Sequence, residues 1–322
     1  MKKAIVLLLV LAVLGGAVFA QVTVGVTASG GVTLFDQDTM ATFARDGAAY
    51  DLLTFKASKD KTSVAFTVDN FDSYTTAANF VFRDWYFATA NDMVKIILGK
   101  PRNGDFRAAM DHGWYADVGS TYRFFGGASY GAIVESTGLG ALTLGLGLGI
   151  PEAGVDSVDM LEKANLAVKY DIADVGTIKA LAMLDLTGNT GAVQTIGASF
   201  GYTGMENLSA TLYTRAILGD DNQFYVAGSA YYTMDKLYLG FEAEYLSNWG
   251  GVDAPSVGAK VAYNVTDPLS VFVKAGYKTD ETMHFWGGVD YDFIPGLTAE
   301  FEAGSKAGDV MYDLSVYYSY SF

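Results

Sequence analysis

The chain has 322 residues, of which 51% are hydrophobic, 14% aromatic and only 18% charged, and its formal net charge is −15. The absence of cysteine excludes a disulfide scaffold, a thiol nucleophile and a cysteine-ligated metal site. Two histidines leave little from which to build another metal site, and the acidic balance argues against nucleic acid as a partner. A helical membrane protein would show several apolar runs of about 20 residues, whereas the one sustained apolar run here lies within the first 20.

The N-terminal segment has the features of an export signal. Lys2 and Lys3 precede an apolar stretch over 5–14, and small residues lead up to Ala20. This is the order of a secretory signal peptide, and at about 1.5 Å per residue the stretch is too short for a membrane anchor. We predict a signal peptide over 1–20, cleaved after Ala20, and an exported single domain over 21–322. Loss of Lys2 and Lys3 takes the formal charge from −15 to −17.

From residue 22 onward the chain repeats one pattern, in which apolar residues alternate with small or polar ones. The segment 256–263, for example, places Val257 and Val261 on one face and Lys260 on the other. Successive side chains of a strand point to opposite faces, so each segment is predicted to be an amphipathic strand. All five prolines fall at or beside segment ends, where a missing backbone N–H is tolerated. The expected strands are 22–35, 49–58, 61–71, 78–90, 92–100, 122–135, 139–150, 163–171, 175–186, 193–203, 206–218, 221–233, 235–247, 255–264, 267–278, 282–293, 296–304 and 309–322.

This pattern predicts an all-β antiparallel fold of about 18 strands, with 16 as the alternative, since merging segments would lower the number. A soluble sandwich would turn its apolar face inward, whereas a transmembrane barrel turns it to lipid and lines a lumen with polar residues. Tight connections alternate with generally longer ones (36–48, 101–121, 151–162 and 248–254), and charged residues lie mostly opposite the apolar face, with Asp84 as an exception. The apolar faces carry aromatic residues near the segment ends, as interfacial girdles do: Phe80, Tyr86, Tyr170, Tyr232, Tyr245, Tyr263, Tyr277 and Tyr291. These features favour the barrel.

The chain ends on an aromatic strand with Phe322 as its last residue. This ending resembles the terminal strand of Gram-negative outer-membrane proteins, in which the C-terminal Phe resembles the signal read by the barrel-assembly machinery. The resemblance implies an outer-membrane location, with the assembly machinery and outer-membrane lipids as partners.

A second resemblance covers residues 84–123. The stretch Asp84-Trp85-Tyr86-Phe87, followed by 94–100 with its terminal Gly99-Lys100, resembles the part of the general diffusion porins that precedes their constriction loop. It implies a loop after the fifth strand, 101–121, that folds into the pore. It also implies passage of small hydrophilic solutes and ions, and a homotrimer.

An independent observation agrees with an in-folded loop. The expected lumen faces of the flanking strands carry runs of small residues, which leave room for a loop to lie against the wall: Gly127, Ser129, Gly131, Gly145, Gly147 and Gly149. The alternative is that these glycines relieve barrel curvature.

The candidate site is a pore constriction made by this loop and the facing wall, with acids and bases set across a transverse field. Selectivity would follow lumen charge and pore width, and the acidic total predicts a weak cation preference. The basic candidates are Lys56, Arg83, Lys95, Arg102, Arg107 and Arg123, and the acidic ones are Asp69, Asp105, Asp111, Glu135, Asp290 and Glu300.

No enzymatic chemistry, cofactor or metal is expected. His112 and His284 lack a nucleophile at a catalytic spacing. The sequence therefore predicts an outer-membrane porin, and the alternative is a surface antigen or adhesin whose pore is incidental or plugged.

Overall fold

The structure is a computed structural model that describes residues 23–36, 52–69, 81–100, 130–150, 164–185, 193–218, 223–249, 252–277, 283–306 and 308–321. Within these ranges the chain forms eighteen strands, as the alternation predicts, and not sixteen. The strands are β1 (Thr23–Asp36), β2 (Leu52–Lys59), β3 (Thr62–Asp69), β4 (Val81–Ala90), β5 (Val94–Lys100), β6 (Tyr130–Ser136), β7 (Leu142–Ile150), β8 (Ala164–Ile172), β9 (Gly176–Leu184), β10 (Val193–Met205), β11 (Leu208–Ile217), β12 (Gln223–Met234), β13 (Leu237–Trp249), β14 (Val252–Thr266), β15 (Leu269–Tyr277), β16 (Met283–Ile294), β17 (Leu297–Lys306) and β18 (Asp309–Ser321). No helix in the described ranges is long and apolar enough to cross a membrane.

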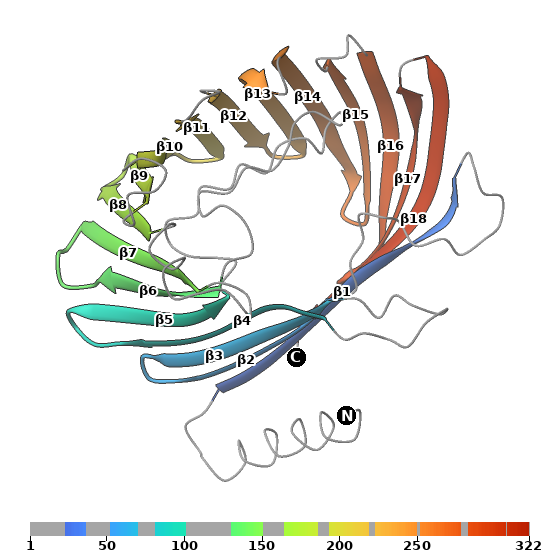
Figure 1. The fold of residues 1–322 in the computed structure, drawn as a ribbon. Coiled ribbons are helices and arrows are strands. Elements are labelled where there is room, and N and C mark those ends of the chain that lie inside the picture. Colours follow the sequence, from blue (N-terminus) through green and yellow to red (C-terminus); the bar gives the residue numbers. More distant parts are fainter. Residues whose placement is uncertain are drawn as a thin grey trace.

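The strands form one antiparallel sheet that closes on itself (Figure 1). Each strand pairs with its neighbours in the sequence, and β1 pairs with β18 as well as with β2. Closure leaves no strand edge with unpaired backbone groups, which is what a sheet surrounded by lipid requires. The predicted antiparallel barrel is confirmed.

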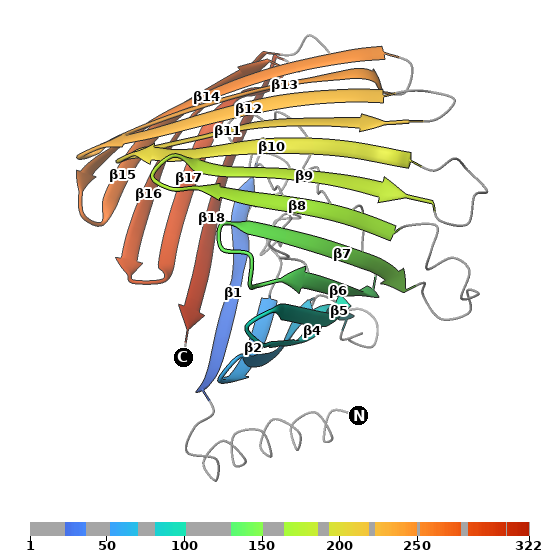
Figure 2. The same ribbon diagram turned by 90° about the vertical axis from the view of Figure 1, so that its left-hand side faces the viewer.

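Short turns gather at one end of the barrel, the end at which β1 begins and β18 finishes (Figure 2). Five of them have two residues, and three of these five hold an Asp or Asn with positive φ: Asp60 at 52°, Asn207 at 66° and Asp235 at 50°. Asn and Asp tolerate this left-handed conformation better than other residues with a side chain. The local sequence therefore determines where these hairpins reverse.

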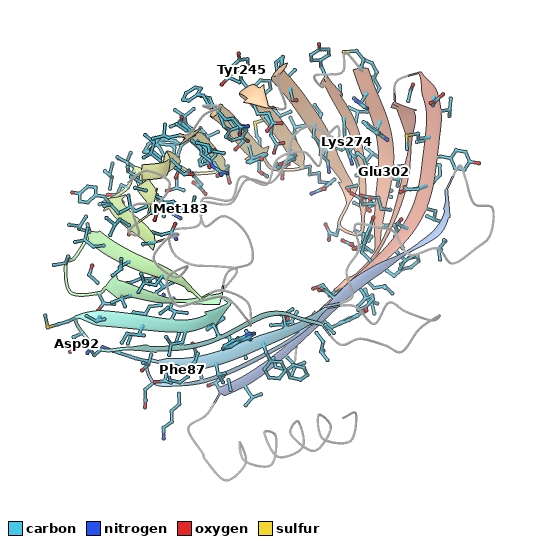
Figure 3. The ribbon with its side chains drawn as sticks, viewed as in Figure 1. Phe87, Asp92, Met183, Tyr245, Lys274 and Glu302 are labelled. Carbon is cyan, nitrogen blue, oxygen red and sulfur yellow. The ribbon has the colours of Figure 1, made fainter. Side chains whose placement is uncertain are left out.

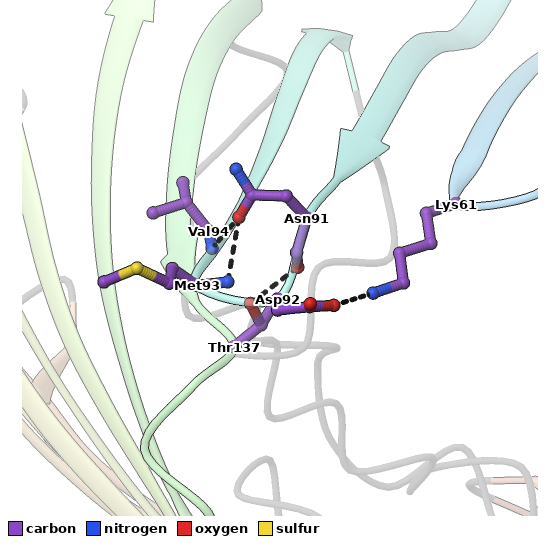
Figure 4. A network of polar contacts seen from close by, with 6 residues as sticks. All are labelled: Lys61, Asn91, Asp92, Met93, Val94 and Thr137. Atoms are coloured by element: carbon purple, nitrogen blue, oxygen red, sulfur yellow. Dashed lines mark hydrogen bonds and ion pairs between the residues drawn. The ribbon is translucent and has the colours of Figure 1, made fainter.

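Hydrogen bonds also join neighbouring turns (Figure 4). The side-chain oxygen of Asn91 accepts bonds from the backbone N–H groups of Met93 and Val94, both at 2.8 Å. Thr137, the residue after β6, donates its hydroxyl to the Asn91 carbonyl at 3.0 Å, and Lys61 forms an ion pair with Asp92. The ends of three successive hairpins are thus held together.

At the opposite end of the barrel, the prediction of one of the longer loops is wrong. Residues 248–254 are not a longer loop, because β13 continues to Trp249 and β14 begins at Val252. Pro255 consequently lies inside β14, opposite Tyr245, and not beside a strand end.

Along most of the described strands burial alternates, with the apolar side chains on the exposed face, as expected of a lipid-facing barrel. On β13, Phe241 and Tyr245 are exposed on the outside, whereas Glu242 and Glu244 are buried on the lumen face. Figure 3 shows Phe87 and Tyr245 pointing away from the barrel, and Lys274 and Glu302 pointing into it. The apolar face is therefore the outer one.

One aromatic residue faces the other way from the prediction. Trp85 and Phe87 are exposed on the outer face, whereas Ala88 is buried and Tyr86 packs against the lumen-side cluster around it. The cause is a bulge in β4, where position 84 pairs with Thr67 and position 82 already pairs with Val68. The extra residue shifts the alternation by one. Position 84 is then paired with Thr67 and no longer follows the alternation of the preceding residues. This explains why the sequence pattern assigned the charged Asp84 to the apolar face.

Candidate functional site

The lumen face of β5 and β6 brings together two of the predicted site residues. Lys95 and Glu135 lie directly opposite each other, with the lysine Nζ 2.9 Å from a carboxylate oxygen. Glu135 is only 2% exposed and the Lys95 side chain 30% exposed, so the carboxylate is buried while its partner still meets the lumen. Next to it, Ala88, Ile97 and Ile133 form an apolar cluster on the same face.

The small residues predicted on this wall are where they were expected, as far as the described residues reach. Gly131, Gly145 and Gly147 are buried on the lumen face of β6 and β7. Gly145 lies opposite Glu135, and Gly149 lies opposite Gly131. Gly127 and Ser129 fall outside the described residues.

Basic side chains dominate the lumen face from β2 to β11. Lys56 lies opposite the buried Ala65, and Lys169 lies opposite Lys179. Lys169 also forms an ion pair with Asp171 at 3.2 Å. Arg215 follows in β11, on the same face as the buried Tyr213. Lys169, Lys179 and Arg215 were not among the predicted site residues, although the alternation assigns each of them to the polar face.

Two buried carboxylates on β13 were also missed. The hydroxyl of Tyr225 donates to Glu244 at 2.9 Å, and the hydroxyl of Tyr231 donates to Glu242. The two glutamates are 6% and 1% exposed. Because they are two residues apart on the polar face of 237–245, the alternation alone could have identified both as lumen residues.

The last five strands place the predicted Asp290 and Glu300 directly opposite each other on β16 and β17. Asp290 accepts a hydrogen bond from the Ser270 hydroxyl at 3.2 Å. Nearby, Lys274 forms an ion pair with Glu302, a residue that was not predicted.

The remaining predicted residues stay predictions. Asp69 pairs with Leu52 and Val81 at the end of β3, and Arg83 occupies the bulge of β4, but the structure describes only their backbone. Outside the described residues lie Arg102, Asp105, Arg107, Asp111, Arg123, the loop 101–121, the signal peptide 1–20 and Phe322.

The described lumen charges are segregated by sign. From β12 to β18 the carboxylates are Glu242, Glu244, Asp290, Glu300, Glu302 and Asp313, set against Lys260 and Lys274. The wall from β2 to β11 carries the basic residues described above, set against Glu135, Asp171 and Asp185. An acidic wall therefore faces a basic one, which produces an electric field across the lumen. No group of three His, Asp or Glu side chains in the described part of the chain is arranged to hold a metal ion.

Comparison with known proteins identifies barrels of the same kind. Three solved structures of mutants of the Rhodopseudomonas blastica porin each match 93% of this chain and 100% of their own. Their TM-scores are 0.55 each, and their sequence identities are 13%, 13% and 14%. No family model and no curated protein matches the sequence. The likeness confirms that the fold is a porin-like β-barrel.

Proposed function

We propose that this chain is an outer-membrane porin, a water-filled channel through which small hydrophilic solutes and ions diffuse passively. The observation that carries the proposal is the inverted barrel, closed without an edge, with large apolar side chains outside and charged side chains inside. A continuous apolar outer surface is unfavourable in water but is required in lipid. The likeness to porin structures supports the same function.

The proposal includes the route by which the chain reaches its place. The signal peptide over 1–20, cleaved after Ala20, would direct export, and Phe322 would present the C-terminal strand to the barrel-assembly machinery. Outer-membrane lipids would then cover the apolar face. The porin resemblance further suggests a homotrimer.

Single-channel recording in a planar bilayer tests the proposal. The refolded mature protein is expected to produce discrete current steps whose size rises with salt concentration, as in a water-filled pore. The same preparation without the refolding step serves as the control. An absence of steps from folded protein would contradict the porin and leave the surface antigen or adhesin.

A further inference from the structure

The lumen face of β14 to β17 carries two like-charged pairs of opposite sign. Lys260 lies directly opposite Lys274, and Asp290 lies directly opposite Glu300. Like charges in directly opposed positions destabilise a sheet. A solute that brought a carboxylate to the lysine pair and an ammonium to the acidic pair would gain an attractive interaction at both.

The lysine pair is held over a fixed aromatic ring. The ammonium nitrogens of Lys260 and Lys274 lie 4.5 and 4.9 Å from the centroid of the Phe272 ring. Phe272 is 4% exposed, and its ring lies across Gly288, so close that a Cβ there would come within 2.3 Å of it. The cationic side of this wall is therefore arranged before any solute arrives, which reduces the entropy lost on binding.

The acidic side is continuous with the lysine pair. Glu302 binds the ammonium of Lys274 and lies opposite Asp313 on β18. Asp290, Glu300 and Glu302 lie on the same lumen face as Lys260. The carboxylates outnumber the lysines on this wall, so a simple anion would meet net repulsion.

The distance between the lysine pair and the acidic pair favours a solute with two separated charges. Lys274 lies opposite Trp286, and Asp290 is four residues further along the same strand, or about 13 Å at about 3.3 Å per residue. The long lysine side chains shorten this gap. A peptide of three residues extends to roughly 10 Å and carries its opposite charges at its two ends.

We propose that this wall is a subsite for zwitterionic short peptides, with the peptide carboxylate at Lys260 and Lys274 and its ammonium at Asp290 and Glu300. The inference rests on the proposed porin function and adds a solute class to it.

The test is block of ion current by trialanine at pH 7. Trialanine with free termini is expected to reduce the current in a saturable way. Forms with one terminus capped should block roughly fivefold more weakly, and the fully capped form should show no saturable block. Equal block by the free and fully capped peptides would overturn the inference.

Variants locate the block. Lys260→Gln and Asp290→Asn are each expected to weaken trialanine block roughly fivefold, whereas Lys260→Arg retains it. Lys236→Gln, at an exposed turn, is the matched control and should leave block unchanged. Normal conductance steps with block unaffected by the two test substitutions would overturn the inference alone. A wild-type protein without conductance would overturn the porin proposal, and this subsite with it.

Discussion

Gly288 shows how little space a single lumen position can have. A Cβ at this residue would lie 2.3 Å from the Phe272 ring and 2.7 Å from the Phe301 carbonyl oxygen. We expect Gly288→Ala to destabilise the barrel by about 1–3 kcal/mol, the usual cost of overpacking, measured as a lower midpoint of thermal unfolding in detergent. Gly287→Ala is the control, because a Cβ there would meet only ordinary contacts at 3.5 and 3.8 Å. Equal midpoints for the two variants would refute the steric argument.

At the same scale, the sequence could assign a face to a charged residue but could not identify its partner. Alternation alone places Lys95, Glu135 and Glu300 on the lumen face. The ion pair between Lys274 and Glu302 could not be predicted from the sequence, because the two residues lie on strands that are not adjacent, β15 and β17. Their contact depends on the register of β16 between them.

At the scale of the element, a hairpin turn supplies a titration that can be measured. A hydrogen bond from Lys61, together with its positive charge, lowers the pKa of the exposed Asp92 carboxyl below its usual 3.8. A lowered pKa in the folded state means that this contact stabilises the fold above pH 3.8 and is lost as the pH falls through the depressed value. Carbon-13 NMR of labelled aspartate should show a midpoint below 3.8, and Lys61→Met should return it towards 3.8. An unchanged midpoint in that variant would exclude Lys61 as the cause.

The strands themselves were the most predictable elements, and β4 shows why the prediction failed in detail. A period of two is imposed by backbone geometry, so each of the expected segments overlaps a strand of the structure. A bulge inserts one residue without any required sequence signature. That Tyr86 lies on the lumen side and not on the predicted outer side therefore became visible only with the pairing of β3 and β4.

At the scale of the whole molecule, we expect the acidic wall of the lumen to favour cations over anions. We expect a tenfold KCl gradient to give a reversal potential of the cation-selective sign. Glu302→Gln and Asp290→Asn should each lower the cation-to-anion permeability ratio, by roughly 1.5- to 3-fold for one lumen charge in partly screened water. Asp235→Asn, at an exposed turn, should leave it unchanged. Raising the salt should weaken the preference, and an anion-selective wild-type channel would contradict the assignment.

The pairing of β1 with β18 has a consequence for how the molecule comes into being. The hydroxyls of Thr27 and Ser321 are 3.1 Å apart although 294 positions separate them in the chain. Contacts between such distant positions carry a high entropic cost and form slowly. The seam joining the two ends cannot be made until the last residues have been synthesised. Until then the nascent sheet has two open margins, each able to pair with another chain. A nonsense mutation that removes β18 would thus turn the whole chain into an aggregation hazard, and not merely a slightly smaller channel.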